Sequence, residues 1–152
     1  MPVTVRQGTA ADSRAMAELR WRDSIEGGRA PAGDRDSYVA SFATWVGEHT
    51  STHRPFVAEM DGEVVGMAWL MVSARVPSPA NPHRLFGDVQ SVYVASEVRN
   101  DGIGAALLTE LLAEAARLGL EHVTVHASNR AVPLYQRVGF GQDRCWLRWQ
   151  PE

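Results

Sequence analysis

Residues 99–104 read Arg-Asn-Asp-Gly-Ile-Gly, and they join a predicted strand that ends near Val94 to a predicted helix that begins near Gly102. The start of a helix presents unpaired backbone N–H groups and the positive end of the helix dipole. Glycines let a phosphate approach those groups without a Cβ atom in the way. This turn therefore predicts a site for a phosphate-bearing cofactor.

Two other phosphate-binding loops do not fit the turn. A P-loop requires Gly-Lys followed by Ser or Thr, and the chain has no lysine, since all fifteen basic residues are arginine. The dinucleotide fingerprint requires a third small residue where this chain has Leu107. Nucleotide triphosphate and dinucleotide sites of these kinds are therefore excluded.

The segments around the turn predict a strand–helix–strand unit. Leucines recur at helical spacing after Gly102, and Gly119 is suited to close that helix. The expected elements are a strand over 88–95, a helix over 102–118, a strand over 122–126, a helix over 131–138 and a last strand over 142–149. A βαβ unit places parallel strands in the second half of the sheet, so the sheet is expected to be mixed.

The first half of the chain predicts two helices and a β-hairpin. Thr9 and Asp12 form a weak capping box for a first helix, which ends at Gly27. Asp61 and Gly62 lie between two β-prone runs and favour a type I′ turn, which needs positive φ at both central residues. The other expected elements are a strand over 3–6, a second helix over 37–48, hairpin strands over 55–60 and 63–73, and a proline-containing loop over 76–82.

The composition is that of an ordinary globular chain. Its 152 residues, 45% hydrophobic and 22% charged, suffice for one domain over 1–152 without disulfides or a structural metal. A net charge of −3 and an even spread of arginines argue against nucleic acid as a partner. The one cysteine, Cys145, is expected in a buried strand, and most of the five tryptophans in the core. Without a secretory or membrane-spanning pattern, a cytoplasmic location with no membrane partner is expected.

The turn resembles the acetyl-CoA motif of the GNAT superfamily of N-acetyltransferases, Q/R-x-x-G-x-G/A. Arg99, Gly102 and Gly104 match it. The strand at 92–94 before the turn, and Leu-Tyr followed after three residues by Gly-Phe at 139–140, also match the family at suitable separations. The resemblance implies an α/β (α+β) fold in which helices flank a mixed, centrally splayed β-sheet, in the order βααβββαβαβ.

The resemblance also implies where acetyl-CoA binds. In this family the pyrophosphate rests on the backbone amides of the turn, and the pantetheine arm pairs with the strand before it, because a bulge splays that strand from the next. An asparagine often contacts the cofactor, although here the spacing from Asn129 to Tyr135 is one residue shorter than the common form. The implied cofactor-binding residues are Val92, Tyr93, Val94, Arg99, Asn100, Asp101, Gly102, Ile103, Gly104, Ala105 and Asn129.

Catalytic roles follow from the same resemblance. The family commonly uses a tyrosine to protonate the departing thiolate, and Tyr135 matches that position; packing of its ring is the alternative. Asp88 lies eleven positions before Arg99, where some members carry a catalytic glutamate, but ordered waters could equally deprotonate the amine. A backbone amide near Val94 is expected to polarise the thioester carbonyl.

Three further features concern charge and the acceptor. Asp101 would repel a phosphate, so it is expected to point to solvent or to cap the following helix. Trp21 and Glu26 precede a glycine-rich loop that usually borders the acceptor site in this family, and they are taken as candidate acceptor-binding residues. His49 and His53 lie four apart but have no Glu partner and no third ligand, so no metal is expected.

Two functional hypotheses stay open from the sequence. The first is an N-acetyltransferase that acts on a primary amine of a small molecule or peptide. The second is a non-catalytic acyl-CoA-binding or sensing module of the same fold. A homodimer formed through the apolar last strands is a further expectation.

Overall fold

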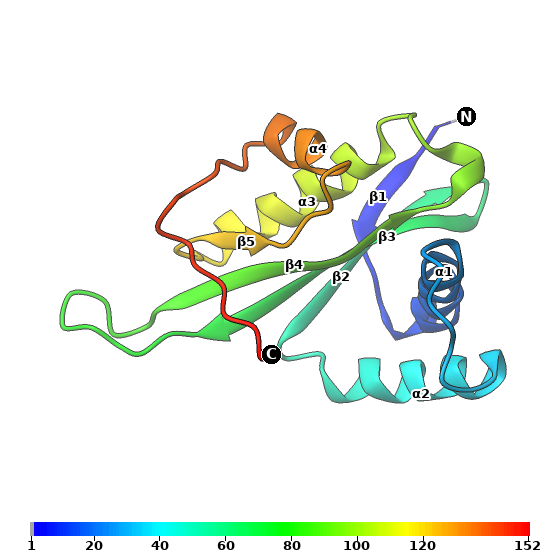
Figure 1. Cartoon of the computed structure of the whole chain (residues 1–152), viewed down its shortest axis with the longest axis horizontal. Helices are drawn as coiled ribbons and strands as arrows, with labels where there is room; N and C mark the ends of the chain where they lie inside the picture. The colour runs from blue at the N-terminus through cyan, green and yellow to red at the C-terminus, as the bar shows by residue number, and fades with distance from the viewer. Residues whose placement is uncertain (1) are drawn as a thin grey trace.

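The computed structural model describes residues 2–152, and Met1 lies outside the described residues. Five strands form one sheet in the order β1-β2-β3-β4-β5, in which β4 and β5 are parallel and the other neighbours antiparallel (Figure 1). The strands are β1 (Thr4–Gln7), β2 (His53–Met60), β3 (Glu63–Ala74), β4 (Leu85–Val94) and β5 (Val123–Val125). The helices are α1 (Ser13–Glu26), α2 (Arg35–Glu48), α3 (Ile103–Arg117) and α4 (Val132–Arg137), with short 3₁₀ turns at Ala10–Asp12 and Ser96–Val98. The expected mixed sheet with flanking helices is confirmed.

Local turn chemistry accounts for two predicted features. Asp61 and Gly62 have φ values of 53° and 78°, as the type I′ turn between β2 and β3 requires. In the 3₁₀ turn that leads into α1, the Asp12 carboxylate accepts a hydrogen bond of 2.8 Å from the Thr9 backbone N–H, which confirms the capping box. Arg6 from β1 donates to the same carboxylate at 2.8 and 2.9 Å. These contacts attach α1 to the edge of the sheet.

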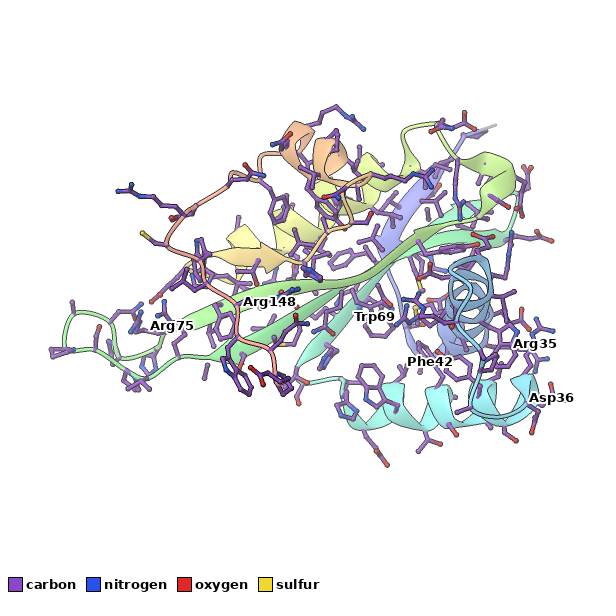
Figure 2. All side chains as sticks on the ribbon, viewed as in Figure 1. Arg35, Asp36, Phe42, Trp69, Arg75 and Arg148 are labelled. Carbon is purple, nitrogen blue, oxygen red and sulfur yellow. The ribbon has the colours of Figure 1, made fainter. Side chains whose placement is uncertain are left out.

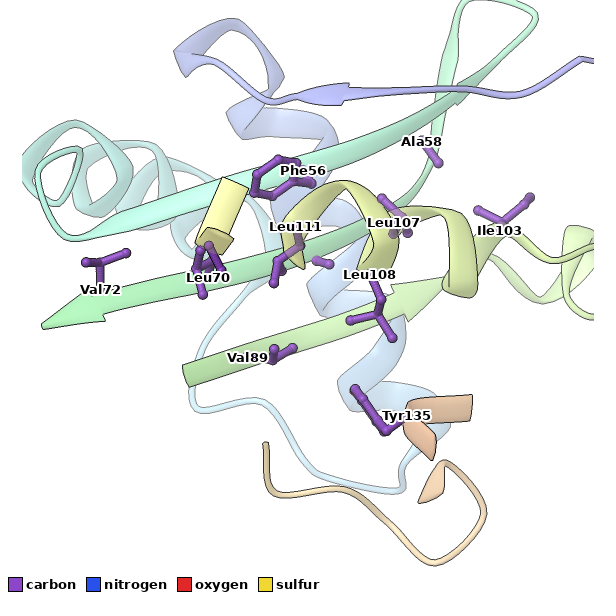
Figure 3. Close-up of a cluster of buried hydrophobic side chains, with 12 residues drawn as sticks. Phe56, Ala58, Leu70, Val72, Val89, Ile103, Leu107, Leu108, Leu111 and Tyr135 are labelled. Carbon is purple, nitrogen blue, oxygen red and sulfur yellow. The ribbon is translucent and has the colours of Figure 1, made fainter. Parts of the chain in front are cut away.

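The helices cover both faces of the sheet (Figure 1). On one face, Leu107, Leu108 and Leu111 of α3 pack among buried residues of β2, β3 and β4, together with Tyr135 of α4 (Figure 3). On the other face, residues of α1 and α2 pack against a second buried group that includes Met67, Trp69 and Tyr93. Leucines spaced along one side of α3 explain the first core, because they form one apolar stripe that faces the sheet.

β4 contains a bulge opposite β3, and beyond this bulge β4 and β5 no longer pair. Met67 pairs with Tyr93 and Trp69 pairs with Gln90, so Ser91 and Val92 oppose the single residue between them, and Ser91 has φ 55°. β5 pairs with β4 only along Gly87 to Val89. The edge of β4 at 92–94 therefore has no strand partner on the β5 side within residues 2–152, and the expected central splay is confirmed.

The prediction of a last strand over 142–149 is wrong. Over 142–149 the chain forms no strand and is exposed throughout. The Asp143 carboxylate accepts from the Cys145 N–H at 2.8 Å and its carbonyl accepts from the Trp146 N–H at 3.1 Å, which makes a turn where the strand was expected. The observed order is thus βααβββαβα. Apolar, β-prone residues alone do not make a strand, because the backbone groups of a strand also need a partner edge.

Side chains of this segment also correct two expectations. Cys145 is exposed, not a buried strand thiol. Trp146 and Trp149 are 56% and 83% exposed, whereas Trp69 is 4% exposed, so the tryptophans are not mostly core residues. A homodimer stays a prediction. The strand over 142–149 through which it was expected to form is not present in residues 2–152. Across residues 2–152, no helix is both long enough and apolar enough to cross a membrane.

Candidate active site

A cleft of about 480 Å³ opens between the splayed part of β4, the start of α3 and the start of α4. Its walls bring together most of the residues expected to bind the cofactor, which lie on β4 and on the turn. The lining residues are Asp23, Val92, Tyr93, Val94, Arg99, Asn100, Gly102, Ile103, Gly104, Ala105, Ser128, Arg130, Ala131, Leu134 and Arg137. The cleft therefore has a strand edge along one wall and a helix start along another.

The glycines of the turn have distinct roles. Gly102 directly precedes α3 with φ 78°, a left-handed conformation that a side chain would strain. A Cβ atom at Gly104 would lie 3.3 Å from Leu134 Cδ2, so this glycine allows α4 to approach α3 closely. Asn100 also adopts a positive φ of 69°, which Asn tolerates better than most residues. The start of α3 thus borders the cleft through residues 102–105, two of which carry no side chain.

Arg99 is held by the protein itself. Its Nη2 donates to Glu26 Oε2 at 2.6 Å, and its Nε donates to the Val94 carbonyl at 2.9 Å. The guanidinium also lies over the Tyr93 ring, 5.1 Å from the centroid. These contacts fix the path of the chain from β4 into the turn and leave the positive charge of Arg99 largely neutralised by Glu26.

Glu26 joins the turn to the strand as well. Its other oxygen, Oε1, accepts a hydrogen bond of 2.7 Å from the Tyr93 hydroxyl. The hydrogen bonds from Tyr93 and Arg99 lower the pKa of Glu26, while burial, and then the bond to Glu26, raise the pKa of Tyr93 to about 12. At neutral pH, Glu26 is therefore ionised and Tyr93 is protonated.

Two expected cofactor residues do not line the cleft. Asp101 is exposed and makes no capping hydrogen bond to α3, which agrees with the expectation that its carboxylate points to solvent. Asn129 is also exposed, between two residues, Ser128 and Arg130, that do line the cleft. The turn thus presents its backbone, and not the Asp101 charge, to the cleft.

Sequence reasoning missed two cationic residues of the cleft. Arg130 and Arg137 lie just before and at the end of α4, on either side of Leu134. Arg130 lies in the turn before α4 and only Arg137 lies in the helix, so no local sequence pattern signalled that the two side chains border the same cleft. They bring two positive charges to the wall opposite the turn, where an anionic ligand would be stabilised.

Tyr135 does not lie in the wall of the cleft, although its neighbour Leu134 does. The side chain is 7% exposed, packs edge-to-face on Phe140 with centroids 5.4 Å apart, and belongs to the core beneath α3. It projects from α4 toward β4 (Figure 3) and also borders a neighbouring cavity beside β5. Burial raises the pKa of its phenol, so the hydroxyl stays protonated and can donate a proton.

Asp88 lies on β4 at the place where β5 still pairs with it. Its carboxylate accepts a hydrogen bond of 2.6 Å from the Thr124 hydroxyl and one of 3.2 Å from Gln90 Nε2. These two hydrogen bonds orient the Asp88 carboxylate. Asp88 lies four residues before the unpaired edge of β4, which begins at Val92. It is not among the residues that line the cleft.

The two candidate acceptor residues are separated. Trp21 packs against Tyr38 of α2 with ring centroids 5.8 Å apart and lines a cavity of about 510 Å³ under the α1–α2 loop. Glu26 instead contacts Arg99 of the glycine turn. The two do not form the joint aromatic and acidic wall that the sequence suggested.

His49 and His53 do approach each other, with ring centroids 5.6 Å apart, and both pack on Trp45. His49 Nδ1 lies 2.7 Å from the Trp45 carbonyl oxygen, and His53 Nδ1 lies 2.8 Å from the Thr52 hydroxyl. In the described part of the chain, no group of three or more His, Cys, Asp or Glu side chains gathers in a way that could hold a metal ion.

Comparison with protein families and curated relatives gives one consistent result. Residues 14–140 match the model of the acetyltransferase (GNAT) family. Mycothiol acetyltransferase of Parafrankia sp. is 34% identical over an alignment of 97 positions, which covers 56% of this chain and 30% of that protein. Glucosamine 6-phosphate N-acetyltransferase of Trypanosoma brucei brucei is 29% identical over 93 residues, 61% of each protein. The chain thus matches only about a third of the length of the mycothiol enzymes.

Solved structures share the fold over nearly the whole chain. A GCN5-related N-acetyltransferase from Ralstonia eutropha superposes with a TM-score of 0.73 at 25% identity and covers 98% of this chain and 99% of that one. A "predicted acetyltransferase with acetyl-CoA" from Clostridium acetobutylicum gives a TM-score of 0.80 at 20% identity, over 98% and 96% of the two chains. At that identity the second likeness concerns the fold alone.

Proposed function

Because this chain belongs to the acetyltransferase (GNAT) family, we propose that it transfers the acetyl group of acetyl-CoA to a primary amine. The acceptor amine belongs to a small molecule or peptide, and it attacks the thioester directly within a ternary complex. The chain forms one such domain. Its cytoplasmic location stays a prediction.

One observation carries this proposal: the unpaired edge of β4 and the glycine-containing start of α3 border the same cleft. Val92, Val94 and Gly102 line the same cleft. A strand edge offers backbone groups to an extended, amide-containing arm, and a helix start offers N–H groups to a phosphate. Acetyl-CoA has both parts joined in one molecule, which is why this cleft suits it better than a free nucleotide.

The phosphate end of the cofactor is assigned to the turn and to α4. The backbone N–H groups of residues 102–105 would receive the pyrophosphate, and Arg130 and Arg137 would supply positive charge from the facing wall. Arg99 is assigned a positioning role, because Glu26 and the Val94 carbonyl already engage its guanidinium.

The thioester end is assigned to the splay of β4. The acceptor nitrogen forms the new C–N bond, and the C–S bond breaks with its electron pair on sulfur. A backbone N–H near Val94 would stabilise the negative charge on the carbonyl oxygen, as an oxyanion hole does. Tyr135 would protonate the departing thiolate, since its buried phenol keeps its proton at neutral pH.

The proton lost by the amine needs an acceptor. Asp88 is the proposed base, acting through water, because its carboxylate is oriented by Thr124 and Gln90 but does not line the cofactor cleft. An ordered chain of water that ends in bulk solvent is the alternative. Asp88→Asn keeps an acceptor oxygen for Thr124 and would separate these two routes through its effect on kcat.

A non-catalytic acyl-CoA-binding module remains the second candidate, favoured by the absence of Tyr135 from the cleft wall. The deciding experiment measures thiol release from acetyl-CoA with a panel of primary amines, alongside acetyl-CoA binding by calorimetry. Amine-dependent thiol release supports the transferase. Binding without release on any amine supports the module. If Gly102→Glu leaves acetyl-CoA binding intact, the assignment of the cofactor to this cleft is wrong.

A further inference from the structure

A second cavity lies on the opposite face of β4 from the core beneath α3. It has a volume of about 420 Å³, within the range of roughly 300–1,000 Å³ that is common for small-molecule sites. It is lined by Arg20, Phe42, Trp45, His53, Trp69, Gln90 and Ser91. No part of the function proposed above uses this cavity.

The bulge in β4 makes the two cavities neighbours. Gln90 and Ser91 both line the second cavity, whereas the next residue, Val92, lines the cofactor cleft. A regular strand would turn Gln90 and Ser91 to opposite faces, and the extra residue of the bulge turns both to the same one. A ligand in the second cavity can therefore approach the unpaired segment of β4 from the side opposite α4.

Three aromatic rings make up the deep wall of this cavity. Trp69 packs edge-to-face against Phe42 and Trp45, with centroids 6.0 and 5.7 Å apart. Figure 2 shows Phe42 and Trp69 in the space between α2 and the sheet. Trp69 is 4% exposed and belongs to the core, whereas Phe42 and Trp45 are only partly buried. Trp69 therefore anchors this wall in the core, and part of the Phe42 and Trp45 rings stays accessible from the cavity.

The charges around the cavity exclude several kinds of acceptor. No Asp or Glu is among its lining residues, so a polycationic amine would find no carboxylate there. Arg20 is the only permanently charged residue in the wall, and it pairs with Asp23 at 3.1 Å, which weakens its attraction for a phosphate. Burial, and then His49, lower the pKa of His53, so this imidazole is uncharged at neutral pH. An uncharged, flat group fits these walls.

We propose that the acceptor is a primary amine that carries an aromatic ring, with the ring between Phe42, Trp45 and Trp69 and the amine at the β4 bulge beside Gln90 and Ser91. This inference rests on the proposed acetyl transfer. Partial removal of the amine from water lowers its pKa, because burial disfavours the charged form, and this increases the fraction of the uncharged, nucleophilic amine. The cavity would thus both select the acceptor and help to activate it.

The experiment compares kcat/KM for 2-phenylethylamine, 2-cyclohexylethylamine and glucosamine 6-phosphate with acetyl-CoA in excess. The first two amines have the same number of heavy atoms and differ in aromaticity. Because aromatic contacts add to simple burial, we expect 2-phenylethylamine to be preferred over 2-cyclohexylethylamine by about threefold to tenfold. The amino sugar phosphate is expected to be the poorest of the three. Equal or better turnover of either competitor overturns the proposal.

Trp45→Leu and Phe42→Leu keep an apolar wall but remove a ring from a partly buried position. Each should reduce the aromatic preference to less than about twofold and leave the KM for acetyl-CoA unchanged. Trp146→Leu is the matched control, since Trp146 packs against His122 and is not among the residues that line this cavity. An unchanged preference in both test variants overturns the proposal.

A failure of the proposed acetyl transfer can be distinguished from a failure of the proposed aromatic site. If no amine releases thiol, the proposed function fails, and direct calorimetry of 2-phenylethylamine still tests the cavity. Binding that Trp45→Leu weakens and Trp146→Leu does not supports the aromatic site. No binding to the wild-type chain in the presence of CoA overturns it.

Discussion

Arg99 Nη2 lies 2.6 Å from Glu26 Oε2, so the arginine of the glycine turn is joined to the last residue of α1. The two residues are 73 positions apart in the chain. The contact gives Arg99 and Glu26 a structural role, which differs from the cofactor-binding and acceptor-binding roles that the sequence suggested. Glu26 holds the arginine of the glycine turn, and the ion pair offsets most of the positive charge of Arg99.

This ion pair predicts non-additive effects on cofactor binding. Glu26→Gln, Arg99→Gln and the double variant should weaken acetyl-CoA binding by similar factors, because loss of either partner already releases the turn. The acceptor KM should not change in Glu26→Gln. Titration calorimetry and steady-state kinetics measure the two quantities. Additive losses, or a raised acceptor KM, would contradict this role of Glu26.

Gly102→Ala should lower the free energy of unfolding by about 1–2 kcal/mol, because a Cβ atom is strained at the left-handed conformation before α3. Acetyl-CoA binding should weaken as the turn adjusts, and Gly102→Asn should have a smaller effect. Gly47→Ala is the control, since Gly47 lies within α2 with open space around it and alanine favours the helix. Urea unfolding and calorimetry provide the comparison.

Arg130→Gln and Arg137→Gln should each raise the acetyl-CoA Kd by about fivefold, corresponding to roughly 1 kcal/mol for an exposed charge contact. The loss should shrink at high salt because the interaction is screened. Arg144→Gln, in the exposed C-terminal segment, should leave the Kd unchanged. Equal losses in all three variants would indicate an effect of net charge and not of the cleft.

Tyr135→Phe should lower kcat about 100-fold, within the range for loss of a general acid, and leave the acetyl-CoA Kd unchanged. The phenylalanine ring preserves the packing on Phe140 and within the core beneath α3. Thermal unfolding should therefore match the wild type. An unchanged kcat would show that the thiolate takes its proton from another source.

Asp12→Asn should destabilise the protein by about 2 kcal/mol at neutral pH, because it removes the charge of a buried carboxylate that accepts hydrogen bonds from the partly exposed Arg6. Hydrogen bonds from Arg6 lower the pKa of Asp12 against the opposing effect of burial. A lowered folded-state pKa gives stability that is present above the unfolded pKa of about 3.9 and is lost as the pH falls through the folded value.

Urea unfolding between pH 2 and pH 7 tests this dependence. The wild type should lose more stability than Asp12→Asn on acidification, and the two curves should converge at low pH. Glu110→Gln, on the exposed side of α3, should follow the wild-type curve. Parallel curves for Asp12→Asn and the wild type would contradict the role of this carboxylate.

Local chemistry explains why much of the fold was predictable. The positive φ angles at Asp61, Gly62 and Gly102 follow from the residue types, since few other residues adopt them without strain. The leucine spacing of α3 defines a single apolar stripe, and that stripe determines which side faces the sheet. Each of these features depends on neighbours within a few positions in the chain.

The last strand shows where local patterns stop being sufficient. Residues 142–149 have apolar residues suited to a strand, but a turn at Asp143 and the lack of a paired edge leave them irregular. Strand formation depends on pairing with another strand that can be distant in the chain. A local pattern of residue types does not predict where that partner lies.

Local sequence patterns were enough to predict the glycine turn, the order of all elements except the last, and the family motif that Arg99, Gly102 and Gly104 match. Three features became apparent only in the folded chain: Glu26 contacts Arg99, Arg130 and Arg137 border the cleft, and three rings meet beside the β4 bulge. The two groups differ in how far apart in the chain the interacting residues lie. Backbone conformation and helix periodicity are set by neighbouring residues, whereas these contacts join side chains from segments that only the packed sheet and helices bring together.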